Sequence, residues 1–149
     1  MSFSIDGKTV IVTGAANGIG AALARHFAEN GANVMCADID EKALKKDLGE
    51  SADDSNVRYF AGDLREKLTL ANLLSATVDA FDRVDVLVNA SRQVATTDPL
   101  DMDDETVEKL LQQNLMTSLR LSQMVAKRMI KQDEEQDHEF AGTIINLSS

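Results

Sequence analysis

A glycine-rich turn between a strand and a helix is the feature that most restricts the fold of this chain. Residues 13–20 read Thr-Gly-Ala-Ala-Asn-Gly-Ile-Gly. A short β-branched run at residues 8–12 precedes the turn, and residues 21–29 follow it with apolar residues at helical spacing. A strand, a glycine turn and a helix in this order predict the first unit of an α/β sheet protein.

The turn has the chemistry of a diphosphate-binding loop. Glycine adopts positive φ and lets the backbone approach a ligand closely. The N–H groups and the positive dipole end at the start of the following helix attract phosphate. Asn17 can also hydrogen-bond across the turn. We therefore expect this loop to bind a dinucleotide cofactor through Gly14, Asn17, Gly18, Ile19 and Gly20.

An acidic residue, Asp38, follows the second expected strand (residues 33–37), 18 positions after Gly20. A carboxylate there can accept hydrogen bonds from the adenosine ribose hydroxyls, and it repels the additional phosphate of NADP. The neighbouring residues Ala15, Ala16 and Ile39 carry no charge that would attract this phosphate. NAD is the expected cofactor and NADP the less favoured one; the alternative is a surface aspartate without a role.

A second acid, Asp63, stands with Leu64 just after the third expected strand, residues 57–61. Its carboxylate can face the exocyclic amine of adenine at this edge of a parallel sheet. The alternative is that the Gly-Asp pair marks only a turn.

The alternation of strands and helices continues to residue 147. Further strands are expected at residues 84–89 and 143–147, and helices at 41–48, 66–81 and 103–130. Such alternation implies parallel pairing with right-handed crossovers. The prediction is one doubly wound α/β domain over residues 1–149, with helices on both faces of the sheet.

Charge and composition exclude several other classes. The net charge is −10, with 25 acidic residues against 15 basic ones, so a nucleic-acid partner or an anionic membrane surface is not expected. No apolar run is long enough to cross a bilayer, and the first residues lack the pattern of a signal peptide. A cytoplasmic location is the expectation.

The cysteine and histidine residues do not suggest a metal site. Cys36 is the single cysteine and lies in an apolar strand, which predicts a buried structural thiol. His26 and His138 lack a partner at metal-binding spacing. The polar run at residues 131–139 is expected to be a solvated helix end and a surface loop.

The pattern Thr13-Gly14-x-x-x-Gly18-Ile19-Gly20 resembles the cofactor loop of the short-chain dehydrogenase/reductase family. Later residues resemble that family's motifs in the same order and over essentially the whole chain. They are the NAD-selecting acid Asp38, the adenine-contacting acid Asp63, the strand-end motif Val86–Asn89, the helix asparagine Asn114, and the serine segment Ile145–Ser149.

The resemblance implies a Rossmann-like sheet in the order 3-2-1-4-5, with the family's last strands missing. It implies NAD(H)-dependent hydride transfer between nicotinamide and a small alcohol or carbonyl substrate. Ser149 would orient the substrate oxygen, Asn114 would anchor a water in the proton relay, and Asn89 would border the cofactor. The helix at 103–130 would pair subunits in a homodimer or homotetramer.

The chain departs from the family at two places. Asn89-Ala90-Ser91-Arg92 stands where Asn-Asn-Ala-Gly is usual, either by substitution or by loss of one asparagine, and Arg92 is expected to crowd the cofactor. The only tyrosine is Tyr59, and no Tyr-x-x-x-Lys occurs, so these 149 residues should not turn over and a longer natural chain is expected.

Two other functions remain open. A non-catalytic dinucleotide-binding or regulatory module would keep the fold and need neither Asn114 nor Ser149. An interaction protein would use the long helix through Leu115, Leu119, Met124 and Met129, although apolar residues at this spacing are more often part of a core.

Overall fold

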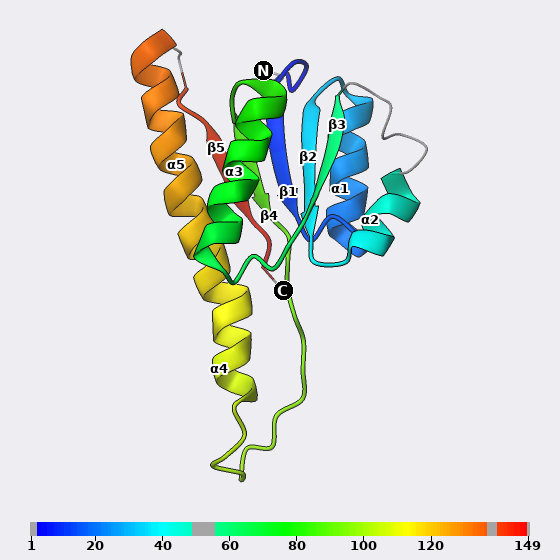
Figure 1. Cartoon of the computed structure of the whole chain (residues 1–149), viewed down its shortest axis with the longest axis vertical. Coiled ribbons are helices and arrows are strands. Elements are labelled where there is room, and N and C mark those ends of the chain that lie inside the picture. Colours follow the sequence, from blue (N-terminus) through cyan, green and yellow to red (C-terminus); the bar gives the residue numbers. More distant parts are fainter. Residues whose placement is uncertain (1–2, 49–55, 137–139, 149) are drawn as a thin grey trace.

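The computed structural model describes residues 3–48, 56–136 and 140–148. Strands and helices alternate along the chain (Figure 1). The strands are β1 Thr9–Thr13, β2 Asn33–Asp38, β3 Val57–Ala61, β4 Val86–Asn89 and β5 Thr143–Asn146. The helices are α1 Gly18–Glu29, α2 Glu41–Leu48, α3 Lys67–Phe81, α4 Thr106–Leu111 and α5 Thr117–Gln136, with a π-helical segment, Gln112–Met116, between the last two.

The five strands form one sheet in the order β3-β2-β1-β4-β5, and every neighbouring pair is parallel. This confirms the predicted order. Val12 lies opposite Cys36 of β2 and Val88 of β4. The carboxyl ends of β1, β2 and β4 therefore lie side by side, where ligands bind in open sheets of this kind.

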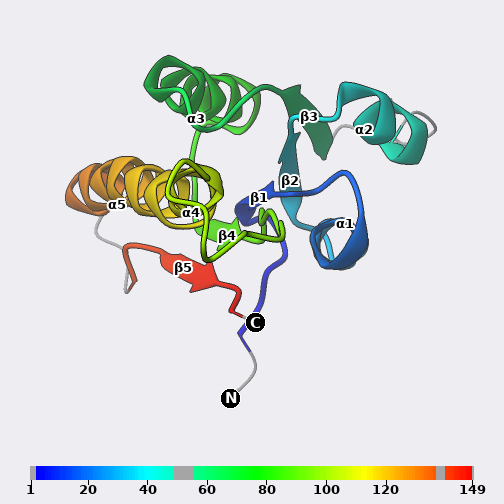
Figure 2. The same ribbon diagram turned by 90° about the horizontal axis from the view of Figure 1, so that it is seen from below.

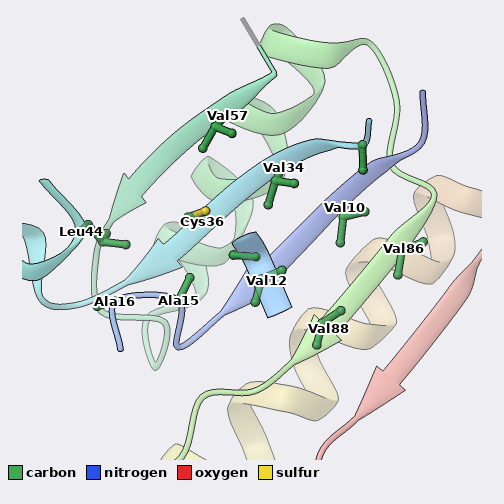
Figure 3. Packing of buried hydrophobic residues seen from close by; sticks show 12 residues of the cluster. Val10, Val12, Ala15, Ala16, Val34, Cys36, Leu44, Val57, Val86 and Val88 are labelled. Carbon is green, nitrogen blue, oxygen red and sulfur yellow. The ribbon is translucent and has the colours of Figure 1, made fainter. Parts of the chain in front are cut away.

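Helices cover both faces of the sheet, as predicted (Figure 2). The cluster on the α1 and α2 side includes Val10, Val12 and Val34 (Figure 3), and the cluster on the α3 and α5 side includes Ile11 and Met35. Successive strand residues point to opposite faces, and both faces are covered, so the central residues 10–12 of β1 are all apolar. Cys36 is buried in the first cluster, as expected.

The long helix differs from its expected bounds of 103–130. It runs through α4, the π-helical segment and α5, from Thr106 to Gln136. Its first turns, with the loop that precedes them, extend beyond the carboxyl ends of the strands (Figure 1). Within the polar run at 131–139, residues 131–136 form the end of the helix, while 137–139 with His138 lie outside the described residues.

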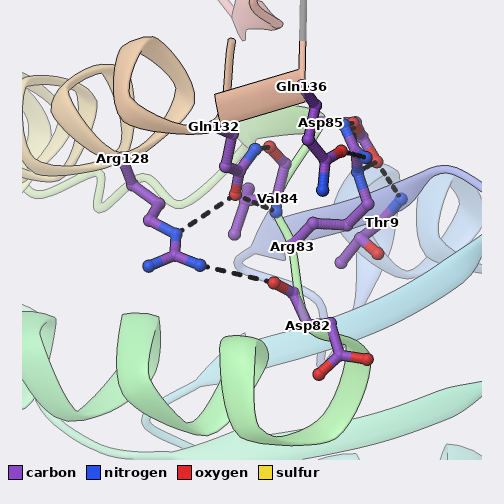
Figure 4. A network of polar contacts seen from close by, with 8 residues as sticks. All are labelled: Thr9, Asp82, Arg83, Val84, Asp85, Arg128, Gln132 and Gln136. Atoms are coloured by element: carbon purple, nitrogen blue, oxygen red, sulfur yellow. Dashed lines mark hydrogen bonds and ion pairs between the residues drawn. The ribbon is translucent and has the colours of Figure 1, made fainter. Parts of the chain in front are cut away.

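Gln132 contradicts the expectation of a solvated helix end, because its side chain is only 5% exposed. Its amide accepts a hydrogen bond from the backbone N–H of Val84 at 2.9 Å and donates to the Val84 carbonyl at 2.8 Å (Figure 4). This pairing occupies the Val84 backbone, and β4 begins at Val86 instead of the predicted residue 84.

An ion pair lies beside this contact. Arg83 binds the carboxylate of Asp85, with 2.7 Å between Nη2 and Oδ1, and Asp85 also accepts the backbone N–H of Thr9 at 2.9 Å. Together with Gln132, these bonds attach the end of α5 to the entry of β4 (Figure 4). None of the described helices combines the length and the apolar character that a bilayer crossing needs.

Candidate dinucleotide-binding site

The turn between β1 and α1 is packed too closely for side chains at two of its glycines. Gly14 has φ of +66°, and a Cβ added there would lie 2.8 Å from the Cα of Ser91. A Cβ on Gly20 would lie 2.1 Å from the carbonyl oxygen of Gly14. The predicted strand-to-helix bend is therefore present, and it depends on glycine at both positions.

The start of α1 is open to a ligand. Asn17 has an extended backbone and its side chain makes no capping hydrogen bond to the helix, and the first turn contains no acidic residue. Gly18 and Ile19 are exposed, and a Cβ on Gly18 would meet nothing within 4 Å. Uncapped N–H groups at a helix start are suitable donors for a diphosphate, so the residues of this loop fit such a group.

Asp38 lies against this loop. Its Oδ2 accepts the backbone N–H of Ala16 at 3.1 Å, and its Oδ1 accepts the N–H of Asp40 at 3.0 Å. The sequence indicated a ribose contact for this carboxylate, but it did not indicate that Asp38 also holds the glycine turn. A half-buried carboxylate thus stands at the carboxyl end of β2, beside the start of α1.

The segment with Asp63 and Leu64 borders Asp38, because the N–H of Gly62 donates to the Asp38 carbonyl at 3.0 Å. Leu64 is buried in the core cluster beneath α3 and α5. Asp63 is paired with Arg65, whose Nη2 lies 2.6 Å from Oδ2. The hydrogen bonds from this guanidinium lower the pKa of the Asp63 carboxyl below its ordinary value.

Arg65 was missed in the sequence, where its position two residues after Asp63 would have indicated the pairing. The pair lies largely at the surface, and 29% of the Asp63 side chain is exposed. An adenine contact for Asp63 therefore remains a prediction.

Asn89 joins three elements behind the loop. It is only 5% exposed, and its Nδ2 donates to Ser122 Oγ of α5 at 3.0 Å and to Asn146 Oδ1 of β5 at 2.8 Å. Its amide therefore faces the helix and the edge strand. Ser122 was also missed, and its only signal is a polar residue beside the apolar Leu121 of the same helix.

The backbone after β4 is bound to the glycine turn through Thr13. Thr13 Oγ1 accepts the N–H groups of Ala90 and Ser91, both at 3.2 Å, and donates to the Val88 carbonyl at 3.4 Å. The backbone nearest to the Cα substituent position of Gly14 is therefore that of Ser91 and Ala90, and the side chain of Arg92 is exposed. The expected crowding of the cofactor by Arg92 stays a prediction.

Asn114 lies in the π-helical segment and faces the loop after β4. Its Oδ1 accepts the N–H of Gln93 at 2.7 Å, and its Nδ2 donates to the Gln93 carbonyl at 2.8 Å. The Thr117 hydroxyl donates to the Gln112 carbonyl at 3.1 Å, across the same segment. Ser149, the predicted catalytic serine, lies outside the described residues.

The described parts of the chain contain no cluster of three or more His, Cys, Asp or Glu residues that could hold a metal ion. The hydrogen-bonding groups that gather at the carboxyl ends of β1, β2 and β4 are backbone N–H donors, the accepting carboxylate of Asp38, and carboxamides. This set is suited to a polyhydroxylated phosphate ester, which needs hydrogen-bond partners for both its phosphates and its sugars.

Comparisons with known proteins agree with this chemistry. The short chain dehydrogenase family matches residues 8–149. D-threitol dehydrogenase of Mycolicibacterium smegmatis is 33% identical over 99% of this chain, and an oxidoreductase of Thermotoga maritima is 32% identical over 97%. NAD-dependent glycerol dehydrogenase of Listeria innocua is 29% identical over 99%.

The chain spans about half the length of these relatives, 54% in each case. The match of the family to nearly all of the chain coincides with the parallel sheet and with the glycine turn between β1 and α1. The chain belongs to the short-chain dehydrogenase family of oxidoreductases.

Proposed function

We propose that this protein is an NAD(H)-dependent oxidoreductase that interconverts a small alcohol and its carbonyl compound. The observation that carries the proposal is the hydrogen bond from the Ala16 N–H to Asp38 Oδ2, which holds a carboxylate beside the open start of α1. A diphosphate on the loop would place the adenosine ribose within reach of this carboxylate. Its charge disfavours NADP.

Each part of the site has a proposed role. Residues 14–20 bind the diphosphate, through Gly14, Asn17, Gly18, Ile19 and Gly20. Asp38 accepts the ribose hydroxyls, and Asp63 with Leu64 borders the adenine. Asn89 fixes the ends of β4 and β5 below the nicotinamide half. NAD, when bound, supplies the hydride acceptor for an alcohol and, as NADH, the hydride donor for a carbonyl.

The catalytic roles belong to the whole protein and are proposed for Asn114 and Ser149. Asn114 is held by Gln93 at the carboxyl end of the sheet, a suitable place from which to order a water molecule. Tyr59 lies on β3 and no Tyr-x-x-x-Lys occurs in residues 1–149, so this chain alone should bind the cofactor without turnover.

The second candidate is a non-catalytic dinucleotide-binding module, favoured by Arg92 at the position of the family's usual glycine. Both candidates predict NAD(H) binding, so binding alone does not separate them. Reduction of carbonyl compounds by the full-length gene product separates them, since a module would leave NADH unoxidised with every substrate.

Substitution of Asp38 by asparagine tests the cofactor assignment. Asparagine keeps an oxygen that can accept the Ala16 N–H but removes the charge. We expect NADPH to bind about tenfold more tightly, which corresponds to relief of a like-charge repulsion of about 1.4 kcal/mol. The dissociation constants of NADH and NADPH are measured by fluorescence titration.

The matched control for this experiment is Asp79→Asn, which removes an equal charge from an exposed position on α3. Its cofactor preference should equal that of the unmodified chain. If the unmodified chain binds NADH and NADPH equally well, the assignment of NAD is wrong.

A homodimer or homotetramer is proposed through the long helix. Val125 and Met129 are buried in the core, as the spacing predicted. Four other apolar residues at four-residue intervals are instead between 45% and 56% exposed: Val107, Leu111, Leu115 and Leu119. An exposed apolar stripe of this length on one helix is typical of a subunit contact.

Leu115→Lys is expected to shift the protein towards the monomer, since burying a lysine charge in an apolar contact is unfavourable. We expect the dissociation constant of the oligomer to rise at least about tenfold. Sedimentation velocity over a concentration series gives this constant. Asn72→Lys on the exposed face of α3 is the control, and equal masses for both variants would contradict the proposed contact.

A further inference from the structure

Arg92 follows a residue that is fixed on three sides. The N–H of Ser91 donates to Thr13 Oγ1 at 3.2 Å, and Ser91 Oγ accepts Gln113 Nε2 at 3.3 Å. The Ser91 backbone also lies against Gly14, where a Cβ would come within 2.8 Å. The amino side of Arg92 is therefore held directly beside the glycine turn.

The residue after Arg92 is fixed as well. Gln93 exchanges two hydrogen bonds with the side chain of Asn114, one through its N–H at 2.7 Å and one through its carbonyl at 2.8 Å. The backbone of Arg92 thus lies between the loop proposed for the diphosphate and the asparagine proposed for the proton relay. Its Cα position is set by both contacts.

The side chain of Arg92 is exposed, and its guanidinium has no hydrogen-bond or ion-pair partner within residues 3–48, 56–136 and 140–148. By contrast, Arg65 and Arg83 each bind a carboxylate. In a chain with 25 acidic residues, a guanidinium whose backbone is held beside the proposed ligand site, and which has no carboxylate partner, is available for an external anion. A guanidinium suits carboxylate or phosphate, which it binds with two parallel hydrogen bonds.

We propose that Arg92 binds an oxyanion of the ligands at this site. The inference rests on the proposed dinucleotide function and extends it. The oxyanion is either the cofactor diphosphate or a carboxylate or phosphate on the substrate, and the same guanidinium chemistry serves both. If the oxyanion belongs to the substrate, the substrate is an anionic alcohol or ketone.

The experiment compares the unmodified chain with Arg92→Gln, Arg92→Lys and the charge-matched control Lys46→Gln, an exposed residue in the last turn of α2. Calorimetric titrations use inorganic pyrophosphate and NADH. With NAD⁺ present, further titrations use glycerate, glycerol 3-phosphate and the neutral glycerol. We expect Arg92→Gln to weaken anion binding about tenfold, Arg92→Lys to weaken it less, and Lys46→Gln to leave it unchanged.

The pattern of losses identifies the source. Weaker pyrophosphate and NADH binding assigns Arg92 to the diphosphate, whereas weaker glycerate or glycerol 3-phosphate binding with unchanged NADH assigns it to the substrate. If Arg92→Gln binds every anion as the unmodified chain does, or if the unmodified chain binds none of them, the inference is overturned. If NADH does not bind while pyrophosphate binding depends on Arg92, the proposed cofactor function fails and the anion site stands.

Discussion

Replacing Gly20 with alanine should lower the free energy of unfolding by about 3 kcal/mol and abolish NADH binding. The added Cβ would lie 2.1 Å from the carbonyl oxygen of Gly14 and 2.7 Å from its carbonyl carbon. Both are backbone atoms, which cannot move aside as a flexible side chain can. The turn would have to open, and Gly14 would then lose its contact with Ser91.

Gly18→Ala is the control in the same turn. Its φ is +58°, but a Cβ there meets no atom within 4 Å. Only the left-handed backbone conformation is penalised, at about 1 kcal/mol. Urea denaturation of both variants gives the two free energies. Equal losses would show that the close packing of Gly20 against Gly14 does not stabilise the turn.

Replacing Gln132 with alanine should lower the free energy of unfolding by about 3 kcal/mol. The substitution leaves the buried N–H and carbonyl of Val84 without partners and opens a cavity beside β4. We expect the Val84 amide to exchange with solvent faster than in the unmodified chain. Denaturation and hydrogen exchange measure the two effects independently.

Two further variants test whether the buried amide causes this loss of stability. Gln132→Glu keeps the acceptor for the Val84 N–H but places a buried carboxylate oxygen against the Val84 carbonyl oxygen, so its cost in stability should be at least as large as that of alanine. Gln136→Ala removes an exposed acceptor of Arg83 Nη1 and should change the stability by no more than about 0.5 kcal/mol. A Gln132→Ala variant as stable as Gln136→Ala would contradict a structural role for the buried amide.

The sheet could be predicted from the sequence because each strand is a short apolar run and the apolar residues of each crossover helix recur at helical spacing. β3, for example, has the bounds expected from residues 57–61. The glycine turn was also predictable, since three glycines between a strand and a helix restrict the backbone strongly. The pairing of Asp38 with Ala16 was not, because it depends on how β2 is aligned with β1.

The missed residues share a physical reason. Gln132 and Ser122 are polar residues whose burial depends on a partner far along the chain, 48 residues away for Val84 and 33 for Asn89. A periodicity argument assigns such residues to solvent, because it takes account only of their polarity. Leu115 and Leu119 show the converse: helical spacing alone favours a place in the core, but both side chains are exposed.

The π-helical segment lies where the long helix has two different sides, the exposed apolar row and the side that contacts the loop after β4. In an α-helix, residues four apart are displaced around the axis by about 40°, so a row at this spacing gradually winds away from a flat partner. A π turn contains more residues than an α turn and rotates the row in the opposite sense. The π-helical segment Gln112–Met116 lies between Leu111 and Leu119, where such a rotation would offset part of the winding of the outer row. Asn114 of the same segment hydrogen-bonds to the backbone of Gln93, while its neighbour Leu115 belongs to the exposed outer row.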